Sequence, residues 1–194
     1  MSAAEKFTLD PKGVTYVSNP TLTLTATERK RLTLKAILLD AEGNVVTYNE
    51  VSFDVFPSTN CERKNAPEII YLPTPGEYNV LGELVTVKRS AMLPMHFVSR
   101  KTGHKAVAAF KPADFSYWYD KAADMITPIC ECTFTLDGAT PILTSANTDK
   151  DGRWQRELAC AELVKDGKRY MITTVDLREE NPVCKIFLDN LAEA

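Results

Sequence analysis

The chain has 194 residues, of which 44% are hydrophobic and 25% are charged, and its formal net charge is −3. This composition is typical of a soluble globular protein and excludes a fibrous or disordered chain. Acidic and basic residues nearly balance on both sides of Pro57, so no basic face is expected for nucleic acid or anionic lipid. At this length we expect one domain with a partial or small second unit.

The N-terminal sequence lacks the apolar core and cleavage pattern of a secretory signal, and no run approaches the roughly 18 apolar residues of a membrane span. We therefore expect a cytoplasmic protein without a membrane partner. Five cysteines without framework spacing favour reduced thiols: Cys61, Cys130, Cys132, Cys160 and Cys184. With 2 histidines and a C-x-C pair, neither a structural zinc site nor another cofactor is expected.

The first 57 residues are predicted to be rich in β-strands. Residues 31–39 and 45–56 contain many β-branched and aromatic residues, and Gly43 and Asn44 lie between them, which predicts a β-hairpin. Residues 13–18 and 21–27 are predicted to be further strands. We interpret residues 1–57 as a partial immunoglobulin-like sandwich.

Residues 58–67 are polar and proline-bounded, and we interpret them as a linker. After them, strands are predicted at the segments 68–72, 95–99, 140–145 and 169–177, the last entered through a turn at 165–168. Alternating strand and helix patterns predict an α/β domain over residues 68–194, in which helices cover a mostly parallel sheet.

Two helices are predicted in this second region. Asn181 and Pro182 are typical of a helix start, and apolar residues then recur at helical spacing as far as Leu191. Residues 154–164 form a weaker pattern, in which Trp154, Leu158, Ala161 and Val164 share one helical face.

Few residues indicate catalysis. No nucleophile elbow, Walker loop or G-x-G-x-x-G motif occurs, which disfavours acyl transfer and nucleotide binding. His104 follows a glycine, where a polar loop residue is more common than a general base, and His96 alternates with apolar neighbours.

Four acids provide material for a carboxylate pair, although solvated loop acids and helix caps are the favoured interpretation: Asp114, Asp120, Asp124 and Asp176. Asp176 closes a predicted strand, and ligands of open α/β sheets gather beyond the carboxyl ends of strands.

The segment "FKPADFSYWYDKAADMI" concentrates aromatic residues between acids. Sugar rings present apolar C–H faces that stack on aromatic rings while acids bind their hydroxyls. The candidate ligand-binding residues are therefore Tyr117, Trp118, Tyr119, Asp114 and Asp120, with Asp176 and His104 as further candidates. Packing in a core is the favoured alternative. Three consecutive rings cannot face one way, so at least one is expected to point inward, and Trp118 is the ring expected to be exposed.

Several segments, taken in order, resemble the C-terminal region of bacterial family 2 glycoside hydrolases, the β-galactosidase-like enzymes: "HFVSRKTGHKAV", "FKPADFSYWYD", "MITPI", "TPILTSAN", "YMITTVDL" and "NPVCKIFLDNL". The hairpin "LDAEGNVVTYNEVSFDVFP" is similar to the end of a β-sandwich domain of such enzymes. The resemblance covers roughly residues 30 to 194 and implies a fold like glutamine amidotransferases, with a flavodoxin-like sheet and flanking helices.

The resemblance implies a non-catalytic accessory module that packs on a glycoside hydrolase's catalytic domain or contributes to sugar binding. The chain has no room for the family's (β/α)8 barrel of ~250 residues, so no catalytic residue can be assigned. Without a cysteine elbow, the fold would not imply glutamine hydrolysis.

Two alternatives stay open. One is an independent hydrolase using Asp176, Asp114 and His104. The other is a structural interaction subunit, which includes a homo-oligomer, because a partial sandwich leaves strand edges that need another chain or segment.

Overall fold

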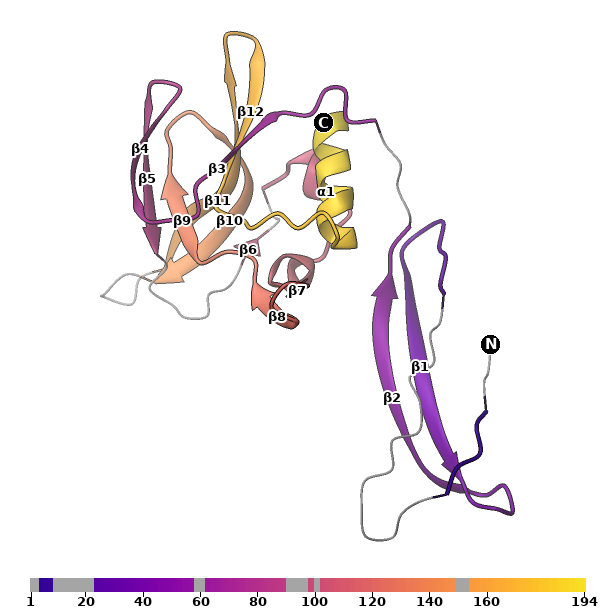
Figure 1. The fold of residues 1–194 in the computed structure, drawn as a ribbon. Coiled ribbons are helices and arrows are strands. Elements are labelled where there is room, and N and C mark those ends of the chain that lie inside the picture. The colour runs from indigo at the N-terminus through magenta and orange to yellow at the C-terminus, as the bar shows by residue number, and fades with distance from the viewer. Residues whose placement is uncertain (1–3, 9–22, 58–61, 90–97, 100–101, 149–153) are drawn as a thin grey trace. The chain divides into compact units, whose positions relative to one another are not determined.

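A computed structural model describes residues 4–8, 23–57, 62–89, 98–99, 102–148 and 154–194 (Figure 1). The chain divides into two compact units, Met1–Pro57 and Ser58–Ala194, here called unit 1 and unit 2.

Unit 1 contains the predicted hairpin, which is confirmed. Strands β1 (Lys30–Leu39) and β2 (Val45–Val55) pair antiparallel, with Leu34 opposite Val51. The turn forms because the Asp40 carboxylate accepts the backbone N–H of Asn44 at 2.7 Å and its side-chain amide at 2.9 Å. The predicted strand at 13–18 lies outside the described residues, and the described part of the one at 21–27 contains no strand.

Unit 2 is built on a mixed sheet of eight strands. Along the sheet the order is β3-β12-β11-β9-β5-β4, and β10 pairs with β11 and with β6. The strands are β3 (Glu68–Tyr71), β4 (Gly76–Val80), β5 (Glu83–Arg89), β6 (Val98–Ser99), β9 (Cys132–Thr135), β10 (Thr140–Thr148), β11 (Trp154–Lys165) and β12 (Lys168–Thr173). Among the described pairings of this sheet, β3 with β12 is parallel and the others are antiparallel.

Among the described residues, short elements and one α-helix accompany the sheet. They are the 3₁₀ turns η1 (Lys105–Val107) and η2 (Pro112–Phe115), the two-stranded ribbon β7 (Tyr117–Asp120) and β8 (Met125–Pro128), and helix α1 (Pro182–Glu193). The predicted C-terminal helix is confirmed. The Asn181 side chain caps it by accepting the N–H groups of Val183 at 2.9 Å and Cys184 at 3.4 Å.

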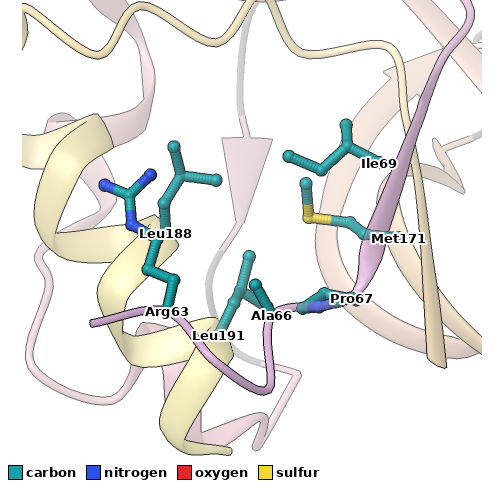
Figure 2. Close-up of a pocket in the computed structure, with 7 residues that line it drawn as sticks. All are labelled: Arg63, Ala66, Pro67, Ile69, Met171, Leu188 and Leu191. Carbon is teal, nitrogen blue, oxygen red and sulfur yellow. The ribbon is translucent and has the colours of Figure 1, made fainter. Parts of the chain in front are cut away.

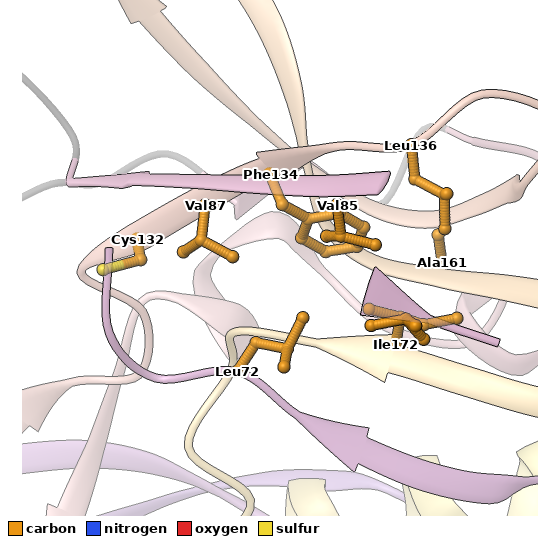
Figure 3. Close-up of a cluster of buried hydrophobic side chains, with 9 residues drawn as sticks. Leu72, Val85, Val87, Cys132, Phe134, Leu136, Ala161 and Ile172 are labelled. Carbon is orange, nitrogen blue, oxygen red and sulfur yellow. The ribbon is translucent and has the colours of Figure 1, made fainter. Parts of the chain in front are cut away.

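The sheet is buried on both faces. On one face it curls around a core in which Val85, Phe134 and Ile172 are 0–1% exposed (Figure 3). On the other face Met171, the neighbour of Ile172 along β12, lies beside Leu188 and Leu191 of α1. Successive residues of a strand point to opposite faces, so the end of β12, from Met171 to Thr173, has buried side chains on both faces of the sheet.

The predicted α/β fold, with a mostly parallel flavodoxin-like or glutamine-amidotransferase-like sheet and flanking helices, is wrong. The sheet is mixed and curled, and α1 is the one α-helix among the described residues. The misleading signal was the alternation of strand and helix patterns toward the C-terminus, which included a helix at residues 154–164. Those residues form a strand, and the sheet's own curl covers the face that a second layer of helices was expected to cover.

The helix predicted at 154–164 is also wrong, because these residues form strand β11. This strand pairs with β9, β10 and β12. Three consecutive residues, Ala159, Cys160 and Ala161, are 0% exposed. Small side chains allow the neighbouring layers to approach both faces of the strand, and these contacts outweigh the helical preference of "WQRELACAELV".

The curled core can be tested by two identical truncations in neighbouring parts of the sheet. Val85 is 0% exposed on β5, whereas Val164 is 61% exposed on β11. We expect Val85→Ala to lower the free energy of unfolding by about 2 kcal/mol, since it loses buried methyl groups and leaves a cavity. Val164→Ala should stay within about 0.5 kcal/mol of the parent. Urea titration measures both, and equal effects would contradict the curled core.

Candidate functional site

The aromatic segment forms the ribbon β7–β8, whose register separates its side chains into two faces. Tyr117 lies opposite Pro128 and Tyr119 opposite Ile126, while Trp118 lies opposite Thr127. Residues directly opposite each other share a face. The first two pairs define the tyrosine face of the ribbon, comprising Tyr117, Tyr119, Ile126 and Pro128.

The tyrosine face points to solvent. The exposed fractions are 46% for Tyr117, 47% for Tyr119 and 66% for Ile126, whereas Trp118 is 2% exposed. The Trp118 indole N–H donates to the backbone oxygen of Asp114 at 2.7 Å, and its ring lies 6.4 Å from that of Phe115. The prediction that the Trp118 ring is exposed is therefore wrong, because this ring is buried and cannot contact a ligand. The rings of Tyr117 and Tyr119 are accessible to one.

Arg178 fixes the inner face of the ribbon. Its side chain is 10% exposed and donates to the Thr127 hydroxyl at 2.7 Å and to the backbone oxygen of Trp118 at 3.3 Å. Two further N–H groups reach one oxygen of Asp176 at 2.8 and 2.6 Å. The guanidinium thus joins both strands of the ribbon to the segment that follows β12. Arginine can make all these contacts because its planar guanidinium carries five N–H donors.

The predicted acids hold the turns around the ribbon. Asp114 accepts the backbone N–H of Lys111 at 2.7 Å, which caps η2. Asp120 accepts the N–H groups of Ala122 and Ala123 at 3.0 and 3.1 Å, which closes the loop between β7 and β8. Its other oxygen lies 3.7 Å from Arg178. Asp120 and Asp176 are thus brought together around one arginine.

Asp124 accepts a hydrogen bond from the Tyr119 hydroxyl, and this bond raises the pKa of that phenol. The bond orients the exposed ring. Nearby, burial first and the Asp176 carboxylate second raise the pKa of Tyr71, so both phenols stay protonated at neutral pH.

His104 lies apart from the ribbon, at the N-terminus of η1. Its Nδ1 accepts the N–H of Ala106 at 3.2 Å, and its Nε2 lies 3.7 Å from one oxygen of Glu162, whose other oxygen pairs with Arg169. Arg169 in turn donates to the backbone oxygen of Leu191 at 3.1 Å. This cluster fastens α1 to the sheet. His96 lies outside the described residues.

The described cysteines, Cys130, Cys132, Cys160 and Cys184, are free and buried, as the predicted reduced thiols require. Burial raises the pKa of Cys130 to about 11 and that of Cys184 to about 12, and it also raises the pKa of Cys132 and Cys160. The Cys130 thiol donates to the backbone oxygen of Cys132 at 2.7 Å. Protonated thiols are poor nucleophiles, so these cysteines do not form a reactive site at neutral pH.

An apolar pocket of about 90 Å³ lies between α1 and the parallel pair β3–β12 (Figure 2). Its one charged lining residue, Arg63, donates to Asp189 at 2.7 Å and pairs with Glu179 at 3.2 Å. Small-molecule sites usually measure ~300–1,000 Å³. This pocket is therefore too small for a sugar ring with its hydroxyls.

The part of the chain that the structure describes contains neither a metal-binding cluster nor a membrane-spanning helix. No group of three or more His, Cys, Asp and Glu side chains is placed to hold a metal ion. No described helix is long and apolar enough to cross a membrane. Comparisons with protein-family models, with curated proteins and with solved structures found no match.

Three residues around the ribbon were not predicted from the sequence: Arg178, Thr127 and Ile126. The Asp-x-Arg spacing at Asp176 and Arg178 could have indicated an ion pair, because an arginine two residues after a carboxylate can turn its guanidinium back toward it. Nothing in the local sequence links that pair to the ribbon about 50 residues earlier.

Replacing Arg178 by methionine should destabilise unit 2. We expect Arg178→Met to lower the free energy of unfolding by about 2–3 kcal/mol, because charge-assisted hydrogen bonds to Asp176 and Thr127 are lost. The matched control Arg89→Met removes an exposed pair with Glu131 and should cost less than about 1 kcal/mol. Urea unfolding followed by near-ultraviolet circular dichroism measures both, and a similar small loss in both would contradict the clamp.

The buried Cys130 thiol should make stability depend on pH in the alkaline range. Unfolded, the thiol ionises near its ordinary pKa of 9.0, whereas folded it keeps its proton to about 11. Its contribution is fully present below pH 9 and is lost as the pH rises toward 11. Cys130→Ser should therefore make the fall in unfolding free energy above pH 9 less steep than in the parent chain. Urea titrations at successive pH values test this, and identical slopes would refute it.

Proposed function

We propose that the chain is a non-catalytic accessory module of a carbohydrate-active enzyme, similar to family 2 glycoside hydrolases, and that its tyrosine face contacts sugar. The module acts in the cytoplasm, where the free thiols of the described cysteines stay reduced. The enzyme class rests on the resemblance of the ordered motifs over residues 30–194. The sugar contact rests on the exposure of Tyr117 and Tyr119 side by side on one ribbon face.

The chemistry of the tyrosine face suits a pyranose. Residues two apart on a strand lie ~7 Å from one another, so the rings of Tyr117 and Tyr119 make a nearly continuous apolar strip. Pyranose rings carry C–H groups on their faces, which pack on such rings, and hydroxyls at their rims. The phenols of the tyrosines and the Asp124 carboxylate provide donors and an acceptor at the rim of the strip.

The size of the tyrosine face favours a small ligand over a protein. An aromatic side chain buries ~150–250 Å² in full, so each half-exposed tyrosine offers on the order of 100 Å². With Ile126 and Pro128 the face reaches a few hundred Å², whereas a stable protein partner covers about 800 Å² on each side. A sugar unit or two would fill the face.

The tyrosine face is also held in place before any ligand arrives. Arg178 fixes the strands of the ribbon from behind, and Asp124 fixes the Tyr119 hydroxyl. Ordering of side chains therefore costs little on binding. This supports the two tyrosines, in place of Trp118, as the contact residues.

An independent hydrolase is less well supported. Asp114 caps η2, Asp176 pairs with Arg178 and His104 faces Glu162, so the described geometry gives each candidate a different neighbour. A general acid and base would have to face one common space.

The proposal is tested with soluble oligosaccharides, including galactosides and glucuronides, titrated against the full chain by calorimetry. We expect Tyr119→Ala to weaken binding at least about tenfold, because a stacked ring contributes of the order of 1.4 kcal/mol. Tyr48→Ala, which removes a 57% exposed tyrosine from unit 1, is the matched control and should leave the affinity unchanged. Absence of binding to every sugar, or an equal loss in both variants, would reject the sugar contact.

A further inference from the structure

The hairpin β1–β2 exposes an unusual amount of apolar surface. Seven large hydrophobic side chains on its two strands are 46–61% exposed: Leu34, Ile37, Leu39, Val45, Val46, Tyr48 and Val51. In the described residues, β1 and β2 form a sheet of two strands. A lone two-stranded hairpin is marginally stable in water, and clustered apolar side chains mark interaction sites.

The register shows which face of the hairpin needs cover. One face carries the facing pairs Leu32 with Phe53 and Leu34 with Val51. We call it the apolar face. Its apolar members are Leu32, Leu34, Ala36, Leu38, Val51, Phe53 and Val55, and its polar members are Lys30, Thr47 and Asn49.

On the opposite face of the hairpin, polar and charged side chains interact with one another. Arg31 pairs with Asp54 at 3.5 Å, and the hydroxyls of Thr33 and Ser52 lie 2.8 Å apart. Lys35 lies 4.0 Å from the centre of the Tyr48 ring. Of the positions paired between Lys30 and Leu38, two of eight on this face are apolar, Ile37 and Tyr48, against seven of ten on the apolar face. The apolar face therefore gains more from being covered, although exposed Ile37 and Tyr48 lie on the opposite face.

The charges at the two ends of the hairpin have opposite signs. The open end carries Arg29, Lys30 and Arg31 against Glu28 and Asp54, a net charge of +1, whereas the turn carries Asp40 and Glu42, a net charge of −2. Hydrogen bonds from Asn44 lower the pKa of Asp40, which keeps it negative at neutral pH. Residues 29–57 contain four basic and four acidic side chains, so their net charge is zero.

We propose that the apolar face is a self-association surface, covered by the same face of a second copy of this chain. The two hairpins are related by a two-fold axis and point in opposite directions. The acidic turn of each copy therefore lies over the basic open end of the other. The same contacts then form twice, as in other isologous dimers. The two ribbons become the layers of a small sandwich, with the charged faces outside.

The expected dimer is weak and reversible. A ten-residue strand is ~33 Å long, and two strands are ~10 Å wide, so each copy contributes a few hundred Å². Stable dimers usually bury about 800 Å² on each side. The association should therefore depend on protein concentration, and on salt through the paired ends.

The first test measures the mass of the full chain by sedimentation equilibrium over a wide concentration range. We expect a monomer–dimer equilibrium that Leu34→Ser weakens at least about tenfold, since the lost leucine counts twice in a symmetric contact. Leu84→Ser is the matched control, because Leu84 is 65% exposed on β5 of unit 2, and it should leave the equilibrium unchanged. A monomer at every concentration, or equal effects of both variants, would overturn the proposal.

The second test exchanges charges and does not depend on the stability of the apolar face. Lys30 has an exposed pair with Glu28 at 3.8 Å, and Glu42 lies in the turn at the opposite end of the hairpin. Glu42→Lys and Lys30→Glu should each weaken dimerisation about three- to tenfold at low salt, and the double variant should regain the parent affinity. Within one hairpin these residues are too far apart to pair, so recovery requires two antiparallel copies. Failure of the double variant to recover would overturn the arrangement, whereas the sugar titration is unaffected by either result.

Discussion

Burial of β12 on both faces is the constraint on which unit 2 depends. Ile172 and Met171 are neighbours in the chain, each is 0% exposed, and they point into different cores. The sheet must therefore curl over one face while α1 covers the other. Arg178 lies five residues beyond β12, so the same strand that joins the two cores also places the guanidinium that holds the β7–β8 ribbon. Core packing and the candidate site are in this way parts of one arrangement.

Features that depend on neighbouring residues could be predicted from the sequence. The hairpin of unit 1 and the α1 start follow from signals within a few residues: Gly43 and the Asp40 turn, and Asn181 before Pro182. The turn between β11 and β12 also formed where "KDGK" indicated it, because Asp166 and Gly167 adopt φ values of 50° and 75°, which that sequence favours.

The sheet architecture could not be predicted in the same way, because it depends on what covers each strand. Every residue from Met171 to Val175 is buried, but the sequence of this segment does not tell whether helices or the sheet itself cover its two faces. The helical pattern of residues 154–164 failed for a related reason. Alanine, leucine and glutamate favour a helix by propensity, but the small size of alanine and cysteine also suits a strand enclosed on both sides, and the pairing with three strands decides between the two.

The candidate site shows how a correct rule can still leave a choice open. Alternation along a strand requires that Trp118 and its two tyrosine neighbours face opposite ways, but it does not say which side is inner. Hydrogen bonding decides in favour of a buried Trp118, because the backbone oxygen of Asp114 accepts the one N–H that an indole must satisfy. The Tyr119 hydroxyl donates to Asp124, and exposed phenols can also bond to water, so exposure costs the two tyrosines little. Trp118, the ring with the largest apolar area, thus stabilises the ribbon from inside. The aromatic rings that this segment presents to solvent are those of Tyr117 and Tyr119, on either side of it.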